Sequence, residues 1–126
     1  MRIMIVDDSS CARMFIEKCL EIIGLADAEL FAAGDGKEAL DKITENPVDL
    51  LITDLSMPIM DGEELLKKVK ESPELRELPV LVVSSAGNPA REEKLLKLGA
   101  FAVLGKPISP VNLLKTLEPL LEQKED

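Results

Sequence analysis

The stretch LLITDLSMPIMDG, residues 50–62, runs from an apolar segment into a single carboxylate and then into a turn. Its first four residues are apolar or β-branched, which is typical of a strand buried on both faces of a sheet. Asp54 stands where that strand should end, and a proline and a glycine follow within eight residues. The stretch predicts a buried strand that ends in an aspartate, which is either the first residue of a loop or a reactive or binding group.

Short apolar runs alternate with helical patterns on both sides of this stretch. The runs lie at residues 3–6, 28–33, 48–53, 80–83 and 100–104. Between them, apolar residues recur at the helical period, and Ser109 followed by Pro110 is a strong start signal for a fifth helix. Five hydrophobic strands alternating with five helices predict an α/β fold with a parallel sheet covered on both faces. We expect the doubly wound, flavodoxin-like arrangement with strand order 2-1-3-4-5.

Apolar stripes assign a buried face to each predicted helix. The first helix is expected to end at Gly24, in the usual glycine position after a helix, and Pro119 predicts a kink or an early end in the fifth. The stripe residues are Ala12, Phe15, Ile16, Cys19, Leu20 and Ile23 in the first helix, Ala39, Leu40 and Ile43 in the second, Leu65, Leu66 and Val69 in the third, Ala90, Leu95 and Leu96 in the fourth, and Leu113, Leu114, Leu117, Leu120 and Leu121 in the fifth.

Composition and charge exclude several classes of function. The 126 residues carry 24 acidic against 15 basic side chains, and a net charge of −9 repels nucleic acid and anionic membranes. The chain has no histidine, the commonest general base and a common metal ligand. No apolar run is long enough for a membrane span or a signal peptide, so we expect a cytoplasmic protein. Cys11 and Cys19, eight residues apart in a predicted helix, lie beyond disulfide reach and are expected to be reduced.

Polar residues stand at the carboxyl ends of four of the five predicted strands. They are Asp7 and Asp8 after the first strand, Asp54 after the third, Ser84 and Ser85 after the fourth, and Lys106 after the fifth. In a doubly wound sheet, ligands bind beyond the carboxyl ends of the strands where the strand order reverses, here between strands one and three. We therefore expect the three aspartates to lie together, with serine and lysine on the same rim.

This set of residue types fits one kind of chemistry. Three neighbouring carboxylates repel one another unless a cation lies between them, and hard oxygen ligands suit Mg²⁺. A lysine and a hydroxyl could bind phosphate oxygens, and an aspartate oxygen can itself attack phosphorus. Taken singly, the acids could simply favour a helix start, the serines could cap, and the lysine could be a solvated loop residue. Together they indicate metal-assisted phosphoryl transfer onto a carboxylate.

The segments IVDDSS (5–10), LLITDLSMPIMDG (50–62), PVLVVSSAG (79–87) and GKP (105–107) resemble the signature segments of the receiver domain of bacterial two-component response regulators. The chain is most similar to the single-domain, chemotaxis CheY-like type, over essentially its whole length. The resemblance implies that Asp54 is the phosphoacceptor and that Asp7, Asp8 and Asp54 bind Mg²⁺ together with the main-chain carbonyl of Ser56. It implies that Ser84 is the switch hydroxyl and that Lys106 pairs with the phosphate.

The resemblance also concerns the loops around these residues. It implies a cis bond between Lys106 and Pro107, and a loop after the acceptor shaped by a positive φ at Gly62. The loop with Ser85 and Ala86 is implied to move when Ser84 is drawn toward a phosphoryl group. Many family members carry a rotating aromatic residue three positions before the lysine. Here that residue is Val103, and Phe101 is expected two residues earlier on the same strand face.

The sequence therefore predicts a cytoplasmic receiver domain over residues 1–126 without an output domain. Its phosphodonor is expected to be a histidine kinase or a phosphotransfer protein. Its target is expected to bind the face of the fourth helix, fifth strand and fifth helix. No nucleic-acid or membrane partner is expected, and the protein is expected to be a monomer. It is not expected to be an enzyme, although it promotes its own phosphotransfer and dephosphorylation.

Two alternatives come from other classes of protein. A phosphatase of the haloacid dehalogenase type also uses a strand-end aspartate with Mg²⁺. Such enzymes normally carry a second acid two residues later, where this chain has Ser56. The other alternative is a receiver fold that binds proteins but no longer accepts phosphate, and the complete set of site residues argues against it.

Overall fold

The five predicted strands form one parallel sheet in the computed structural model, which describes residues 1–85 and 88–124. The strands are β1 (Arg2–Val6), β2 (Glu29–Ala33), β3 (Leu50–Asp54), β4 (Val80–Ser84) and β5 (Ala102–Gly105). Their order, β2-β1-β3-β4-β5, confirms the predicted topology. Only the ends differ, since β3 begins at Leu50 and β5 at Ala102, two residues later than expected.

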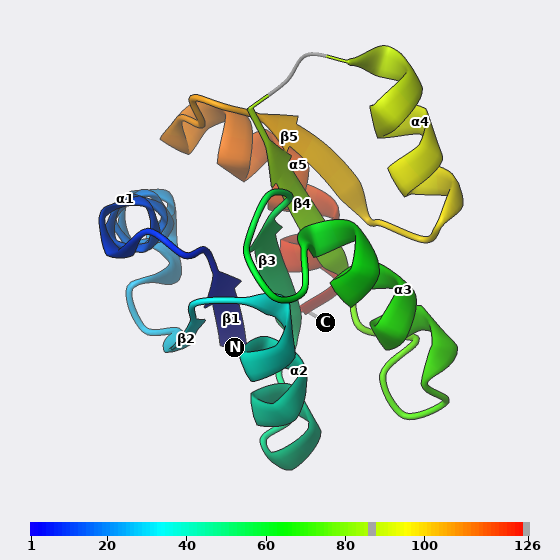
Figure 1. Cartoon of the computed structure of the whole chain (residues 1–126). Helices are drawn as coiled ribbons and strands as arrows, with labels where there is room; N and C mark the ends of the chain where they lie inside the picture. Colours follow the sequence, from blue (N-terminus) through cyan, green and yellow to red (C-terminus); the bar gives the residue numbers. More distant parts are fainter. Residues whose placement is uncertain (86–87, 125–126) are drawn as a thin grey trace.

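Helices cover both faces of this sheet (Figure 1). The helices are α1 (Ser10–Leu20), α2 (Gly36–Glu45), α3 (Gly62–Glu71), α4 (Pro89–Lys97) and α5 (Pro110–Lys124). A π-helical turn, η1 (Glu21–Leu25), extends α1. Gly24 within it has a φ of 99°, as expected for the glycine that ends a helix. None of the helices in the described ranges is both long and apolar enough to cross a membrane.

Alternation along the strands produces two hydrophobic cores. Successive strand side chains point to opposite faces, so Ile3 and Ile5 join one core while Met4 and Val6 join the other. The first core packs under α1 and α5, through residues such as Leu20 and Leu113. The second core lies under α2, α3 and α4. This two-sided burial accounts for the near-continuous hydrophobicity of the strands.

Each α-helix begins with a side chain that accepts a hydrogen bond from the first turn. The capping residues are Ser9, Asp35, Asp61, Asn88 and Ser109. Such caps satisfy main-chain N–H groups that have no partner within the helix. Because the helices follow the strands, these capped ends face the carboxyl edge of the sheet. The predicted start of the fifth helix at Ser109 and Pro110 is confirmed.

Several expected core positions are wrong. Phe15 is 50% exposed, Leu96 is 49% exposed, and Ala90 is exposed as well. A helical stripe predicts which side of a helix faces the sheet, but not how many of its residues the sheet buries. In α4 only Leu95 is buried. A kink or an early end was expected at Pro119, and the early end is wrong, because α5 continues to Lys124. Pro119 has no N–H to donate to the carbonyl of Lys115 one turn earlier. Both residues are exposed, so water can satisfy that carbonyl.

Cys11 and Cys19 are free thiols, as predicted. Cys11 is exposed, whereas Cys19 lies in the core under α1, and burial raises the pKa of the Cys19 thiol. The buried thiol therefore behaves as a small apolar side chain.

Candidate functional site

The structure brings Asp7, Asp8 and Asp54 together. Asp7 and Asp8 follow β1, Asp54 ends β3, and the two strands are neighbours, with Val6 opposite Thr53. One carboxylate oxygen from each aspartate lies within 4.8 Å of the others. Asp7 and Asp54 are only 3% and 8% exposed, whereas Asp8 is exposed. The group therefore combines two buried carboxylates with one that opens to solvent.

Electrostatics at Asp7 reflects this crowding. Burial raises the pKa of Asp7, and the charges of Asp54 and Asp8 raise it further. The main-chain N–H of Ser9, which donates to Asp7 Oδ1 at 2.9 Å, and the ammonium of Lys106 act in the opposite direction without cancelling the shift. The carboxylates thus lack positive charge, and a hard divalent cation such as Mg²⁺ fits this set of oxygens.

Lys106 forms ion pairs with two of the three carboxylates. Its Nζ lies 3.0 Å from Asp54 Oδ1 and 3.9 Å from Asp7 Oδ2. Its main-chain N–H donates to the carbonyl of Ser84 at 2.8 Å, which holds the end of β5 against β4. The peptide bond between Lys106 and Pro107 is cis, as predicted. One ammonium against three carboxylates leaves the cluster negative.

A cavity of about 280 Å³ opens beside Asp54. Ser84, at the end of β4, lines it and is 4% exposed, and Ser56 and Ser85 lie at its surface. The remaining lining residues are Leu55, Met57, Asp61 and Arg91. The predicted switch serine and the predicted acceptor therefore share one cavity. Ala86 lies outside the described residues.

Gly62 acts differently from the prediction. Its φ is not positive, and the left-handed residue of this loop is Ile59, with a φ of 67°. A Cβ on Gly62 would instead collide with the main-chain carbonyl oxygen of Asp54 and with Cα of Leu55. The N–H of Gly62 donates to the carbonyl of Leu55 at 2.9 Å. A glycine is needed because α3 starts directly against the backbone of the acceptor.

Val103 and Phe101 lie in different surroundings. Val103 packs on the core under α2, α3 and α4. Phe101 precedes β5 instead of belonging to it, and its N–H donates to the carbonyl of Val80. The expectation that both lie on one strand face is therefore wrong. Phe101 is placed at the amino-terminal edge of the sheet, opposite the aspartates.

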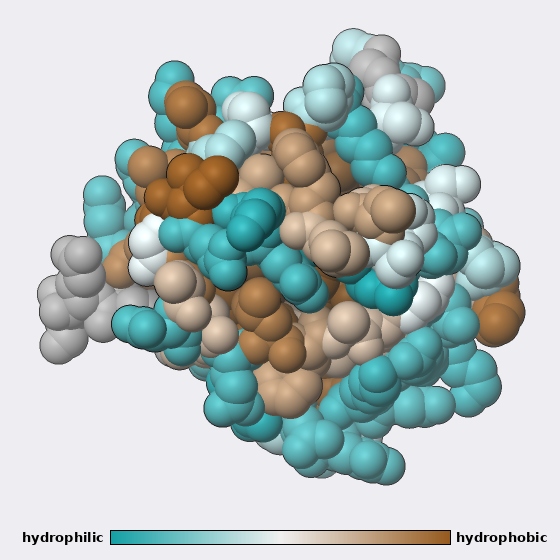
Figure 2. All heavy atoms as spheres, turned by 90° about the vertical axis from the view of Figure 1, so that its left-hand side faces the viewer, coloured by the Kyte–Doolittle hydropathy of each residue, from teal (hydrophilic) through white to brown (hydrophobic). Residues whose placement is uncertain are grey.

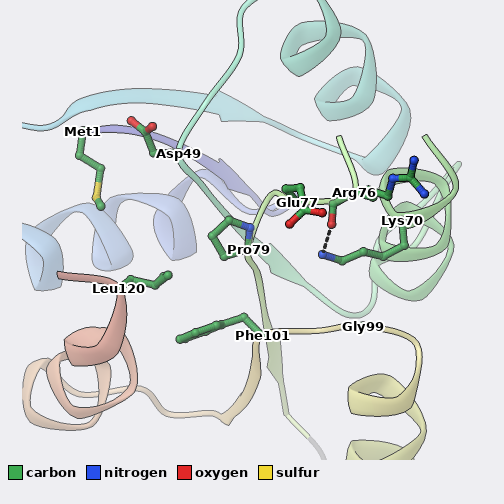
Figure 3. A pocket seen from close by; sticks show the side chains of 9 residues that line it. All are labelled: Met1, Asp49, Lys70, Arg76, Glu77, Pro79, Gly99, Phe101 and Leu120. Carbon is green, nitrogen blue, oxygen red and sulfur yellow. Dashed lines mark hydrogen bonds between the residues drawn. The ribbon is translucent and has the colours of Figure 1, made fainter. Parts of the chain in front are cut away.

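A larger pocket, of about 660 Å³, lies at that opposite edge (Figure 3). Figure 3 shows Phe101 and Leu120 extending toward each other across it, with Lys70 on the far side. The ammonium of Lys70 donates to the carbonyls of Arg76 and Leu78 at 3.0 and 2.9 Å, and burial lowers the pKa of Lys70. No predicted site residue except Phe101 lines this pocket. The Lys70 ammonium therefore holds the turn between α3 and β4.

An apolar groove of about 500 Å³ lies beside the carboxylates, between α1 and the segment after β5. Phe15 lines this groove, which explains why it leaves the core. Pro107 and the exposed Cys11 line it too. Figure 2, turned so that the α1 side faces the viewer, shows hydrophobic residues across the middle of this surface, with hydrophilic residues between and around them.

Arg91 and Glu63 are site residues that the sequence did not single out. Arg91, in the first turn of α4, lines the cavity beside Asp54, and its Nε lies 3.5 Å from Glu63 Oε1 on α3. The available signal was the position of Arg91 in the first turn of the helix after β4, because such turns face the carboxyl edge of the sheet. The contact with Glu63 depends on how two helices pack, which no local pattern encodes.

Comparisons with known proteins agree with this geometry. The family model of the response regulator receiver domain matches residues 3–118. The chemotaxis protein CheY homolog of Campylobacter jejuni is 38% identical over 122 residues, which cover 96% of this chain and 92% of that protein. The crystal structure of a putative response regulator from Chloroflexus aurantiacus superimposes with a TM-score of 0.86. It is 31% identical and covers 96% of this chain and 97% of that one.

The same module also occurs within a much longer protein. The sensor histidine kinase TmoS of Ectopseudomonas mendocina is 37% identical over 98% of this chain, but the chain spans only 12% of the length of that kinase. The family model, the identities and the superposition confirm the predicted family and fold. The chain belongs to the family of response regulator receiver domains, which are phosphoacceptors in signalling, and it is similar to the CheY-like members of that family.

Proposed function

We propose that Asp54 accepts a phosphoryl group from the phosphohistidine of a histidine kinase or a phosphotransfer protein. The observation that carries this proposal is the placement of Asp54, which is nearly buried yet lines a cavity and lies 3.0 Å from the Lys106 ammonium. In the transfer, an Asp54 oxygen forms a bond to phosphorus while the bond from phosphorus to the donor imidazole nitrogen breaks. The electron pair of that bond stays on the imidazole, which takes up a proton.

The other residues act on charge and position. Lys106 neutralises a phosphoryl oxygen, and the Ser84 hydroxyl donates to another. Asp7, Asp8, Asp54 and the main-chain carbonyl of Ser56 would hold Mg²⁺. When bound, Mg²⁺ supplies the positive charge that the acids and the phosphoryl oxygens both lack. Burial of Asp7 fits this assignment, because a buried carboxylate among like charges favours a cation.

The output is a change in protein binding. We propose that the target binds the face of α4, β5 and α5, next to the loop that follows Ser84, and that the protein works as a monomer. The name of the C. jejuni relative refers to chemotaxis, and a chemotaxis-type pathway is one setting for this chain.

Self-dephosphorylation is expected to be slow to moderate, because Ser56 offers water neither an acid nor an amide. Location in the cytoplasm stays a prediction.

Acetyl phosphate with Mg²⁺ tests the proposal, read by intact-mass spectrometry. The wild-type protein should gain one phosphoryl group, and EDTA should prevent the gain. Asp54→Asn should gain none, whereas Asp61→Asn is a matched control, because Asp61 lines the same cavity and asparagine keeps its helix cap. Rapid release of phosphate without a stable adduct would indicate a phosphatase, and no reaction would indicate a module that only binds proteins.

A further inference from the structure

Arg91 lies between the acceptor cavity and a carboxylate on the neighbouring helix. It lines the cavity that also contains Asp54 and Ser84, and its Nε is 3.5 Å from Glu63 Oε1. We propose that Arg91 is a second phosphate-binding cation, which exchanges Glu63 for the phosphoryl group on Asp54 and thereby couples phosphorylation to α4. This inference rests on the proposed function of Asp54.

The backbone of Arg91 is fixed while its side chain is free to move. The N–H of Arg91 donates to Asn88 Oδ1 at 3.2 Å, within the capped first turn of α4. The side chain is 44% exposed, so it can change partner without disturbing a packed core. A movement of this side chain toward the cavity would therefore act on the start of α4, where the helix leaves the loop after β4.

Glu63 does not depend on Arg91 for its charge balance. Its side chain is only 15% exposed and faces three cations, with Lys67 Nζ at 3.4 Å, Lys94 Nζ at 3.3 Å and Arg91 Nε at 3.5 Å. When Arg91 leaves, two ammonium groups still neutralise one carboxylate. Partly exposed ion pairs contribute little each, so the exchange costs little on this side.

The phosphoryl group on Asp54 would gain more from Arg91 than Glu63 would lose. Phosphorylation replaces one carboxylate charge by a group of about −1.5 to −2 with three acceptor oxygens. Lys106 offers a single point charge and also lies within 3.9 Å of Asp7. A guanidinium can bind two phosphate oxygens at once, and such paired hydrogen bonds are stronger than neutral ones. Lys106 comes from the end of β5 and Arg91 from α4, so two elements would bind one phosphoryl group.

Lys94 provides a matched control on the same helix. It contacts the same Glu63 carboxylate at 3.3 Å, but it is not among the described residues that line the acceptor cavity. Lys94→Gln and Arg91→Gln therefore each remove one cation from Glu63 and one charge from α4. They differ in whether the cation removed can reach Asp54.

The probe is beryllofluoride with Mg²⁺, which mimics the phosphoryl group, titrated into the full chain and followed by calorimetry and amide chemical shifts. Arg91→Gln should weaken beryllofluoride binding by roughly ten- to a hundredfold, as expected for lost hydrogen bonds between charged groups. Arg91→Lys should give an intermediate loss, and Lys94→Gln should stay within about twofold of wild type. In the wild-type protein the amides of 88–97 should shift, and in Arg91→Gln these shifts should disappear. Binding of Mg²⁺ alone should not weaken in Arg91→Gln.

The outcomes separate this inference from the proposed function. If the wild-type protein neither binds beryllofluoride nor takes phosphate on Asp54, the proposed function fails and the role of Arg91 fails with it. If the wild-type protein does both and Arg91→Gln binds the mimic equally well, with the same shifts in 88–97, only the inference is overturned. Equal losses in Arg91→Gln and Lys94→Gln would also overturn it, because they would indicate a general effect of charge on α4.

Discussion

At the scale of single residues, Gly62 matters because it lacks a side chain. It allows α3 to begin against the carbonyl of Asp54, which fixes the backbone of the acceptor. Gly62→Ala should lower the free energy of unfolding by about 1–3 kcal/mol, because the added methyl group must displace backbone atoms. Urea unfolding measures the change. Gly105→Ala is the control, since no described atom lies within 4 Å of its Cβ position, and an equal loss there would contradict the explanation.

Asp8 is the carboxylate of the cluster that contributes least to the fold. It is exposed, and its charge acts against the buried Asp7. Asp8→Ala should weaken Mg²⁺ binding by an order of magnitude or more, and should leave the metal-free protein at least as stable as wild type. Thermal melts in EDTA and in Mg²⁺ measure both effects. A strongly destabilised metal-free variant would mean that Asp8 has a structural role instead.

At the scale of secondary-structure elements, Glu63 links α3 to α4. Burial alone would raise the pKa of Glu63, but the ammonium groups of Lys94 and Lys67 outweigh burial and lower it. A carboxyl group with a lowered pKa stabilises the fold above its unfolded pKa, about 4.3, and loses that contribution as the pH falls through the folded value. Glu63→Gln should cost about 0.5–1 kcal/mol at pH 7.

The pH dependence of this cost is the more specific test. The stability difference between wild type and Glu63→Gln should shrink as the pH falls below about 4.3 and should vanish below the lowered folded pKa of Glu63, where both side chains are uncharged. Glu93→Gln is the control, since Glu93 forms an exposed ion pair with Lys97 within α4. A difference that stays constant from pH 7 to pH 3 would show that the Glu63 charge does not matter.

The elements also show how far the sequence determines local structure. Strand positions and helix starts follow from patterns of a few neighbouring residues, such as Ser109 with Pro110, and these were predictable. The exposure of Phe15 was not, because Phe15 lines a groove beside α1 that leaves it half exposed, although Ile16 and Cys19 of the same stripe are buried. The role of Gly62 was not predictable either, because it depends on the position of another strand's carbonyl.

At the scale of the whole molecule, the parallel order brings distant residues together. The meeting of Asp7, Asp8, Asp54 and Lys106 follows from three strand ends at one edge, those of β1, β3 and β5, so it was predictable from the alternation of strands and helices and the expected strand order. The position of Arg91 was not predictable in this way. It lies on a helix and not at a strand end, and its contact with Glu63 depends on where α4 lies relative to α3.

Beryllofluoride bound at Asp54 should change the structure far from that residue only if the Ser84 hydroxyl can move toward it. In the wild-type protein, beryllofluoride should change amide shifts through α4 and β5. In Ser84→Ala the protein should still take phosphate on Asp54, but most of the difference in target affinity should disappear. We expect that difference to be about five- to tenfold in the wild-type protein, in the lower part of the usual range for coupled sites. Shifts confined to the rim around Asp54 in the wild type would contradict this mechanism.

The strand order also has a consequence for the birth of the protein on the ribosome. All three aspartates, and the strands β1, β2 and β3 that bring them together, lie within residues 1–54 and are therefore synthesised before Lys106. The lysine that pairs with two of them is residue 106, so a nascent chain that has folded only as far as β3 would bury two carboxylates without this ammonium. During translation the acids of this edge therefore emerge well before the cation that partly offsets their charge.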